Sequence, residues 1–174
     1  NSAQSGGGGI MAENLTVTGG QITGNFTETG GGGGISTSNF TMTDGIVAGN
    51  TSEELEGGGI RINGGGSEIT GGYVTNNVCN TTQHWGGGGI FVSQGASIKM
   101  RNLLVTDNTA QGLGGGVAGC STGQVAVTTS DGLASFANTA VGDPSHGSGS
   151  SSAKRQDQAA LNNPKFLEYG SNDY

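Results

Sequence analysis

Side chains that could carry acid–base chemistry are few and scattered in this chain of 174 residues. Between residues 40 and 131 the charged side chains are Asp44, Glu53, Glu54, Glu56, Glu68, Asp107 and Asp131, with Arg61, Lys99 and Arg101. General acid–base catalysis requires such groups to converge on one substrate. Lys99 and Arg101 are two residues apart, and we expect them to pair with Glu68 on a solvated strand face. The sequence therefore predicts no catalytic site and no cofactor.

An imidazole and an indole, His84 and Trp85, are adjacent in a long connection between repeats. They could form a platform for a sugar ring, or the tryptophan could fold onto the body of the protein. Neither His84 nor His146 has the neighbouring ligands that a metal site needs. We keep His84 and Trp85 as a possible interaction site and predict no metal.

Five asparagines lie in the Asn-x-Ser/Thr pattern that accepts N-linked glycans, namely Asn14, Asn25, Asn39, Asn50 and Asn80. Asn14 and Asn39 occupy the same place in successive repeats and could carry stacked glycans in a eukaryotic secretory pathway. We expect Asn14, Asn39 and Asn80 to be the glycosylation sites, because Asn25 and Asn50 also belong to a repeated column of asparagines. This pattern favours an extracellular or cell-surface location.

A repeat built on runs of glycine closed by an aliphatic residue positions these side chains. The runs occupy residues 6–10, 30–35, 57–60, 86–90 and 114–117, and their closing residues are 25, 25, 30 and 27 positions apart. Periods of this length are typical of solenoids, in which each repeat buries its apolar face against its neighbours.

Within each repeat the apolar residues alternate as they do in a strand. Leu15 and Val17 flank Thr16, so a spacing of two puts the two apolar side chains inside and the threonine outside. The same reasoning predicts burial of Leu15, Val17, Ile22, Phe40, Met42, Val47, Ile69, Val74, Ile98, Met100 and Val105. A propeller blade needs a longer repeat, and the leucine-rich frame is absent. We therefore predict an all-β parallel β-helix of about five coils of 25–30 residues.

One asparagine recurs near the end of each coil. The members of this column are Asn25, Asn50, Asn77, Asn108 and Asn138. Asparagine tolerates left-handed backbone, and its amide both donates and accepts hydrogen bonds. We predict an asparagine ladder, with ordinary surface turns as the alternative. The glycine runs, which lack Cβ atoms, are expected to stack as a thin, smooth edge of the rod.

The composition agrees with this fold and limits the partners. Glycine accounts for 38 residues, and 6 lysines and arginines against 13 aspartates and glutamates give a formal net charge of −7. Nucleic-acid recognition needs a basic surface, so we predict no nucleic-acid partner. No apolar stretch approaches the length of a membrane-spanning helix.

The two cysteines, Cys79 and Cys120, are predicted not to be bonded to each other. They lie about 11 residues apart around the perimeter of a coil, whereas a disulfide requires Cα atoms within about 7 Å. Only a fold of the 78–86 loop across the coil would change this expectation.

The glycine runs closed by isoleucine, together with Ile/Val-x-x-Asn, resemble the GGA[IL] and FxxN repeats of the polymorphic outer-membrane proteins. The resemblance covers roughly residues 6 to 140. It departs where Ile22, Val47, Val74 and Val105 stand in place of the usual phenylalanine. It implies a right-handed parallel β-helix of the pectin-lyase-like superfamily, serving as an extracellular adhesin-like or passenger-type segment.

After Asn138 the repeat stops. We predict a β-helix over residues 1–141, a flexible Gly/Ser linker over 142–152, and a C-terminal cap or docking arm over 153–174. An open solenoid end exposes strand edges and core. A short helix near residues 154–162, ended before Pro164, would cap this end, and a docking arm on another chain is the alternative. The apolar residues available for either role are Leu161, Phe166, Leu167 and Tyr169.

The first ten residues match residues 108–117 almost position for position, so the chain begins within the repeat. We expect upstream coils or another copy to cover this end, head to tail if the rotation does not close. The predicted function is a non-catalytic, extracellular structural or adhesive module that self-associates as a filament or surface rod. A carbohydrate-binding or carbohydrate-active β-helix is the first alternative, with a glycan or cell-surface ligand. An ice-binding surface is the second, because Thr16-x-Thr18 and Thr41-x-Thr43 stack in register.

Overall fold

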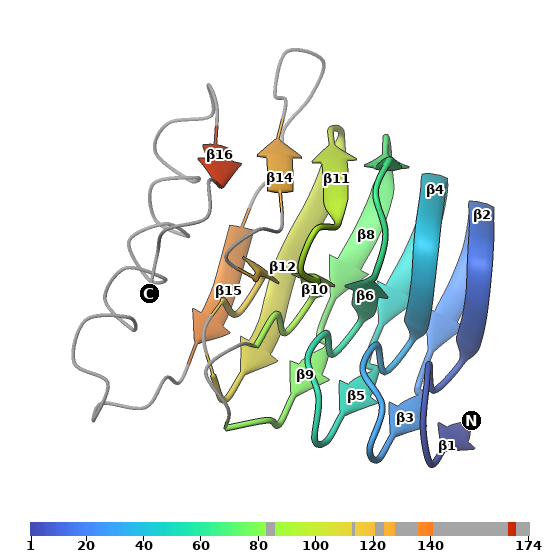
Figure 1. Ribbon diagram of the computed structural model, residues 1–174, viewed down its shortest axis with the longest axis vertical. Coiled ribbons are helices and arrows are strands. Elements are labelled where there is room, and N and C mark those ends of the chain that lie inside the picture. Colours follow the sequence, from blue (N-terminus) through green and yellow to red (C-terminus); the bar gives the residue numbers. More distant parts are fainter. Residues whose placement is uncertain (83–85, 113, 121–123, 128–135, 141–166, 170–174) are drawn as a thin grey trace.

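The computed structural model describes residues 1–82, 86–112, 114–120, 124–127, 136–140 and 167–169. Within these residues the chain is all-β and has no helix. Its strands hydrogen-bond from coil to coil as a parallel solenoid (Figure 1). The predicted architecture of a parallel β-helix is confirmed.

Most strands are short, and two long strands continue around the corners of the first two coils. In chain order they are β1 (Ser2–Ala3), β2 (Ile10–Thr23), β3 (Phe26–Thr27), β4 (Ile35–Ala48), β5 (Thr51–Ser52), β6 (Ile60–Ile62), β7 (Ser67–Ile69), β8 (Gly72–Thr75), β9 (Val78–Cys79), β10 (Ile90–Val92), β11 (Ser97–Met100), β12 (Leu103–Ala110), β13 (Val117–Gly119), β14 (Gln124–Val127), β15 (Phe136–Ala140) and β16 (Leu167–Tyr169).

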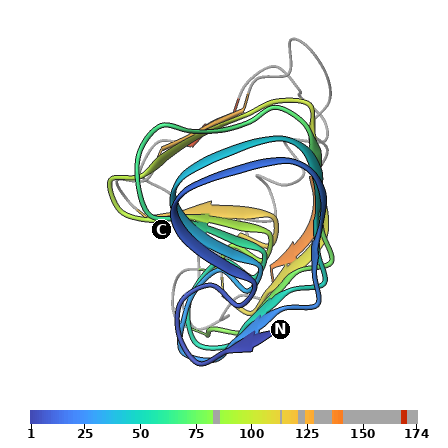
Figure 2. The same ribbon diagram turned by 90° about the vertical axis from the view of Figure 1, so that its right-hand side faces the viewer.

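The coils stack in register on the aliphatic residues that close the glycine runs. In the described part of the chain four coils begin at Ile10, Ile35, Ile60 and Ile90, and part of a further coil begins at Val117. The view along the rod shows these coils superposed (Figure 2). The insertions in the third and fourth coils leave this register unchanged.

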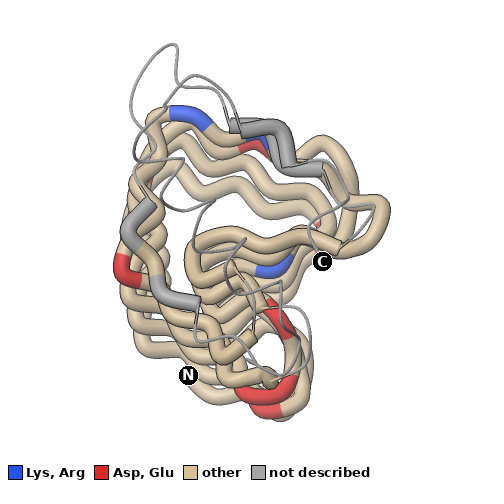
Figure 3. Tube along the Cα trace, turned by 90° about the vertical axis from the view of Figure 1, so that its left-hand side faces the viewer, with Lys and Arg blue, Asp and Glu red and all other residues tan. Residues whose placement is uncertain are grey.

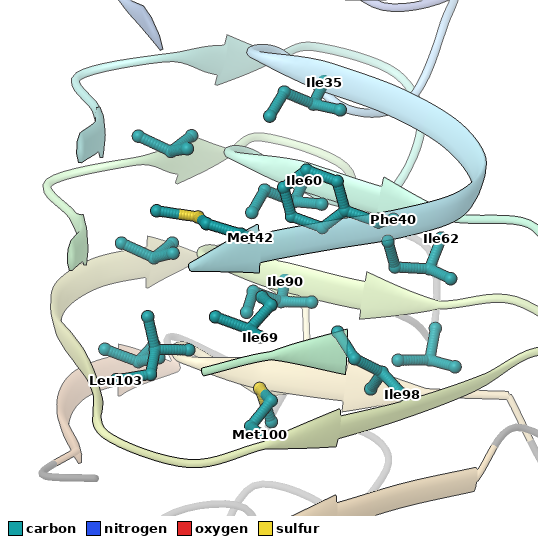
Figure 4. Close-up of a cluster of buried hydrophobic side chains, with 14 of the residues drawn as sticks. Ile35, Phe40, Met42, Ile60, Ile62, Ile69, Ile90, Ile98, Met100 and Leu103 are labelled. Carbon is teal, nitrogen blue, oxygen red and sulfur yellow. The ribbon is translucent and has the colours of Figure 1, made fainter. Parts of the chain in front are cut away.

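Apolar side chains from successive coils form one continuous core (Figure 4). Of the residues predicted to face inward, nine are buried, namely Val17, Phe40, Met42, Val47, Ile69, Val74, Ile98, Met100 and Val105. Leu15 and Ile22 pack against the core but are only partly buried, because they belong to the first coil. Thr16, Thr41 and Lys99 are exposed, as predicted.

The glycine runs stack on one another in register, as predicted, but from the second run to the fourth they are buried and do not form an outer edge. A Cβ on Gly33 would lie 2.3 Å from the carbonyl oxygen of Gly58 and 2.5 Å from that of Thr51. Real Cβ atoms essentially never come within 3.0 Å of such neighbours. The runs therefore pack as bare backbone against the next coil and against the strand that follows the asparagine column. A missing Cβ permits exposure and close backbone contact alike, so composition could not distinguish the two.

The far end of the described chain carries a strand of opposite direction. β16 pairs antiparallel with β14, opposite Val125, Ala126 and Val127, while the other side of β14 pairs with β11. The predicted linker, the predicted helix, Leu161 and Phe166 lie outside the described residues. The assignment of this segment as a cap stays a prediction.

Candidate functional site

The recurring asparagines form a continuous hydrogen-bonded column through the coils. The amide oxygen of Asn50 accepts from the backbone nitrogen of Asn25 at 3.0 Å and from its Nδ2 at 2.9 Å. The same pair of bonds joins Asn50 to Asn77, Asn77 to Asn108 and Asn108 to Asn138, at 2.9 to 3.0 Å. Surface turns would not produce this regular series.

From Asn50 onward, the Nδ2 of each column asparagine also donates to a backbone carbonyl. Asn50 Nδ2 donates to the carbonyl of Ile22, and Asn77 Nδ2 donates to that of Val47, both at 2.9 Å. In the next two coils the Nδ2 atoms of Asn108 and Asn138 donate to a backbone carbonyl in the same way. Side-chain amides that are fully buried, as in Asn50 and Asn77, must find such partners because an unpaired buried amide is costly. Within the described residues no buried side-chain nitrogen or oxygen lacks one.

Left-handed backbone occurs one residue before the column, not at the column itself. The preceding residues Gly24, Gly49, Asn76 and Asp107 have φ of 63°, 62°, 54° and 56°. The sequence pattern gave a signal for this corner, since glycine, asparagine and aspartate adopt positive φ most readily. This left-handed position was not predicted, because the asparagine that follows it already explained why the corner repeats in the sequence.

Two of the exposed glycosylation candidates contact each other. Asn39 Nδ2 donates to Asn14 Oδ1 at 2.9 Å, and both side chains are exposed. Asn80 is partly exposed and donates to Glu53 Oε2 at 2.8 Å. Asn25 and Asn50, in contrast, are 5% and 0% exposed. The structure thus separates the five sequons into three accessible and two enclosed asparagines.

Along the described part of the chain, lysine, arginine and acidic positions lie at several separate places on the coils, and several acidic positions gather at one corner (Figure 3). The predicted pairing of Arg101 with Glu68 is present at 3.8 Å, with both side chains nearly half exposed. Lys99 lies opposite Glu68 in the strand register. No group of three histidine, cysteine or acidic side chains in the described ranges could hold a metal ion.

A second ion pair was not predicted from the sequence. Arg61 Nη1 lies 3.3 Å from Glu56 Oε2, and both side chains are largely buried. The Arg61 Nε donates to Asn63 Oδ1 at 3.0 Å, and Ser93 Oγ donates to the same oxygen at 3.0 Å. These polar side chains satisfy one another across the second, third and fourth coils.

Cys79 and Cys120 are not bonded to each other, as predicted, and both are free and buried. The pKa of the Cys79 thiol is raised from 9.0 to about 11, mainly by burial and to a smaller extent by the negative charge of Glu56. The pKa of Cys120 is raised for the same reasons. Neither environment activates a thiolate, which would require a lowered pKa.

The remaining candidates have partial structural support or none. His84 and Trp85, the possible sugar platform, lie outside the described residues, as does His146. Thr16 pairs with Thr41 in register, but Thr18 pairs with Asp44, and the outward column continues with Glu68 and Lys99. The threonine array is therefore confined to two coils.

Comparisons of the chain with protein-family models, with curated proteins and with solved structures give no match. The structure therefore shows the architecture of a parallel β-solenoid, without a match to a particular family. Over the described ranges no helix has the length and apolar character needed to cross a membrane.

Proposed function

We propose that this chain is a non-catalytic structural or adhesive module of an extracellular β-helix. The observation that carries the proposal is that the repeated residues are used inside the rod. The asparagines bond to one another, the glycines pack against backbone, and the aliphatic residues fill the core. A repeat used in this way maintains a shape, and the variable outward side chains are left for contact with partners.

The first coil supports the part of the proposal that concerns self-association. β2 pairs with β4 alone among the described strands, so its other edge has no partner within the described residues. Ile10, Leu15 and Ile22 are partly exposed there, whereas their equivalents in the next coil, Ile35, Phe40 and Val47, are at most 1% exposed. An open edge with apolar side chains behind it invites strand addition.

Hydrogen bonding at this face favours a further coil of the same kind as the occupant. Ser2 and Ala3 already pair with β3 in the coil register. The amino group of Asn1 lies 3.3 Å from Asn25 Oδ1, as the nitrogen of a ladder asparagine would. A coil from a second copy, or from preceding sequence in a longer polypeptide, would continue both patterns.

The resemblance to the repeats of polymorphic outer-membrane proteins supports the extracellular and adhesive parts of the proposal. The glycine runs and the Ile/Val-x-x-Asn spacing carry that resemblance. No observation on the described residues favours the carbohydrate-binding alternative, and the confined threonine array gives the ice-binding alternative little area.

The test measures the assembly state of the purified full chain by sedimentation velocity over a range of concentrations, with negative-stain microscopy of the same samples. We expect concentration-dependent end-to-end association of the wild type. Leu15→Glu, at the open face, should shift the protein towards monomer. Tyr73→Glu is the control, because Tyr73 is 49% exposed on β8, a strand paired on both sides. A wild-type monomer at every concentration would overturn self-association.

A further inference from the structure

Two of the five sequons are built into the asparagine column, and this has consequences for where the chain can fold. Asn25-Phe-Thr27 and Asn50-Thr-Ser52 satisfy the acceptor pattern as fully as the exposed sequons do. An acceptor sequon is recognised in the unfolded or emerging chain, before burial protects it. The folded structure therefore does not by itself prevent modification of these two residues.

A glycan on Asn50 is incompatible with the column. The sugar would replace one of the two hydrogens on Nδ2, and both are donated, to Asn77 Oδ1 and to the carbonyl of Ile22, at 2.9 Å each. The side chain is fully buried. The glycine that closes the neighbouring run, Gly34, also covers it, since a Cβ there would come within 3.0 Å of the Asn50 amide. No direction remains in which a sugar could leave the nitrogen.

Asn25 is enclosed in a similar way. Its Nδ2 donates to Asn50 Oδ1 at 2.9 Å, and its side chain is 5% exposed. A Cβ on Gly9 would lie 2.8 Å from its Cγ. A sugar here would displace the glycine run of the first coil from the asparagine column.

We infer that N-glycosylation at Asn25 or Asn50 prevents the chain from folding, so that every folded molecule carries both asparagines bare. The three accessible sequons, at Asn14, Asn39 and Asn80, have no such effect. The chain therefore folds in a compartment that does not transfer N-glycans, or in the fraction of molecules in which transfer to Asn25 and Asn50 fails. This inference does not depend on the proposed adhesive or structural role.

The third residue of each enclosed sequon gives a way to remove it without touching the column. Thr27 and Ser52 stack with Cys79 and Ala110 in successive coils. Alanine occupies this position in the fourth coil, and Thr27→Ala/Ser52→Ala abolishes both enclosed sequons, at the cost of the buried hydroxyl hydrogen bonds to the carbonyls of Gly6 and Gly30. The matched control, Thr16→Ala/Thr41→Ala/Thr82→Ala, abolishes the three accessible sequons at exposed threonines.

The full chain and both variants are secreted from a eukaryotic cell that transfers N-glycans, each behind the same signal peptide. They are compared with the same proteins produced in the bacterial cytoplasm. Protease resistance separates folded from unfolded molecules, and glycopeptide mapping locates the sugars in each fraction. We expect loss of the protease-resistant form for the wild type and the control, and its recovery in Thr27→Ala/Ser52→Ala with sugar at the accessible sites. An inhibitor of N-glycan transfer should rescue the unaltered wild type, which guards against a folding defect of the variant. Protease-resistant wild type bearing sugar at Asn25 or Asn50 would overturn the inference.

Discussion

The asparagine column and the outward threonine column run through the same coils, yet one keeps its residue type and the other changes it. Asparagine stands at every position of the first column, from Asn25 to Asn138. The second reads Thr16, Thr41, Glu68 and Lys99 in register. In the asparagine column each side chain is both donor and acceptor for its neighbours, so each coil constrains the next. Outward side chains contact mainly water, and each coil can vary independently.

The largest expected effect concerns the buried glycines. A Cβ on Gly58 would lie 2.4 Å from the carbonyl oxygen of Gly88 and 2.5 Å from that of Val78. Because both neighbours are backbone, Gly58→Ala should destabilise the protein by more than about 4 kcal/mol or prevent folding. Gly65→Ala is the control, since its Cβ would meet only Ser97 Oγ at 3.6 Å. Urea unfolding should show almost no change for the control, and equal losses would contradict the packing role of the runs.

The next prediction compares two hydrogen bonds between asparagine side chains that have the same length, one in the buried column and one at the exposed surface. Asn77→Ala removes the acceptor of both Asn50 bonds and the donor to Val47, all within the buried column. We expect a loss of about 3 to 5 kcal/mol, because several buried polar groups lose their partners. Asn39→Ala removes a side-chain bond of 2.9 Å to Asn14 at the exposed surface, and should cost less than about 0.5 kcal/mol. Thermal and urea unfolding measure both, and similar losses would show that burial does not set the value of the bond.

A smaller effect depends on pH and concerns the buried thiol of Cys79. Its pKa is about 11 in the folded protein and 9.0 ordinarily. The unfolded chain therefore loses its thiol proton first as the pH rises, so stability is full below pH 9 and falls towards pH 11. Between pH 8 and 10.5 we expect a loss of about 2 kcal/mol in the free energy of unfolding, and Cys79→Ala should lack this contribution. Identical pH dependence in wild type and variant would refute the assignment.

The smallest effect is expected at the outward column. Glu68→Gln removes an ion pair with Arg101 that spans 3.8 Å between side chains nearly half exposed. Solvent screens such pairs, so the free energy of unfolding should change by less than about 0.5 kcal/mol. Thermal unfolding at low and high salt measures the change. A loss above about 1 kcal/mol would mean that the outward column shares the constraint of the asparagine column.

Much of the fold could be predicted because register in a solenoid is a property of spacing. The alternation around Thr16 and Thr41 by itself predicts that Val17, Phe40 and Met42 face inward, and all three are buried. The spacing of the asparagines likewise aligned them at one corner, where hydrogen bonding follows from their chemistry. The Arg61 to Glu56 pair could not be predicted, because these residues lie on either side of a glycine run whose path sets their distance.

The sequence by itself determined the period, the strand character, the inward residues and the asparagine column, because each depends on residue type and local spacing. The tertiary structure alone decided that the glycine runs lie inside, that the left-handed residue precedes the asparagine, and that two of five sequons are enclosed. These features depend on which backbone lies against which. A residue without a Cβ, or with a small polar side chain, is compatible with exposure and burial alike until the neighbouring coil is in place.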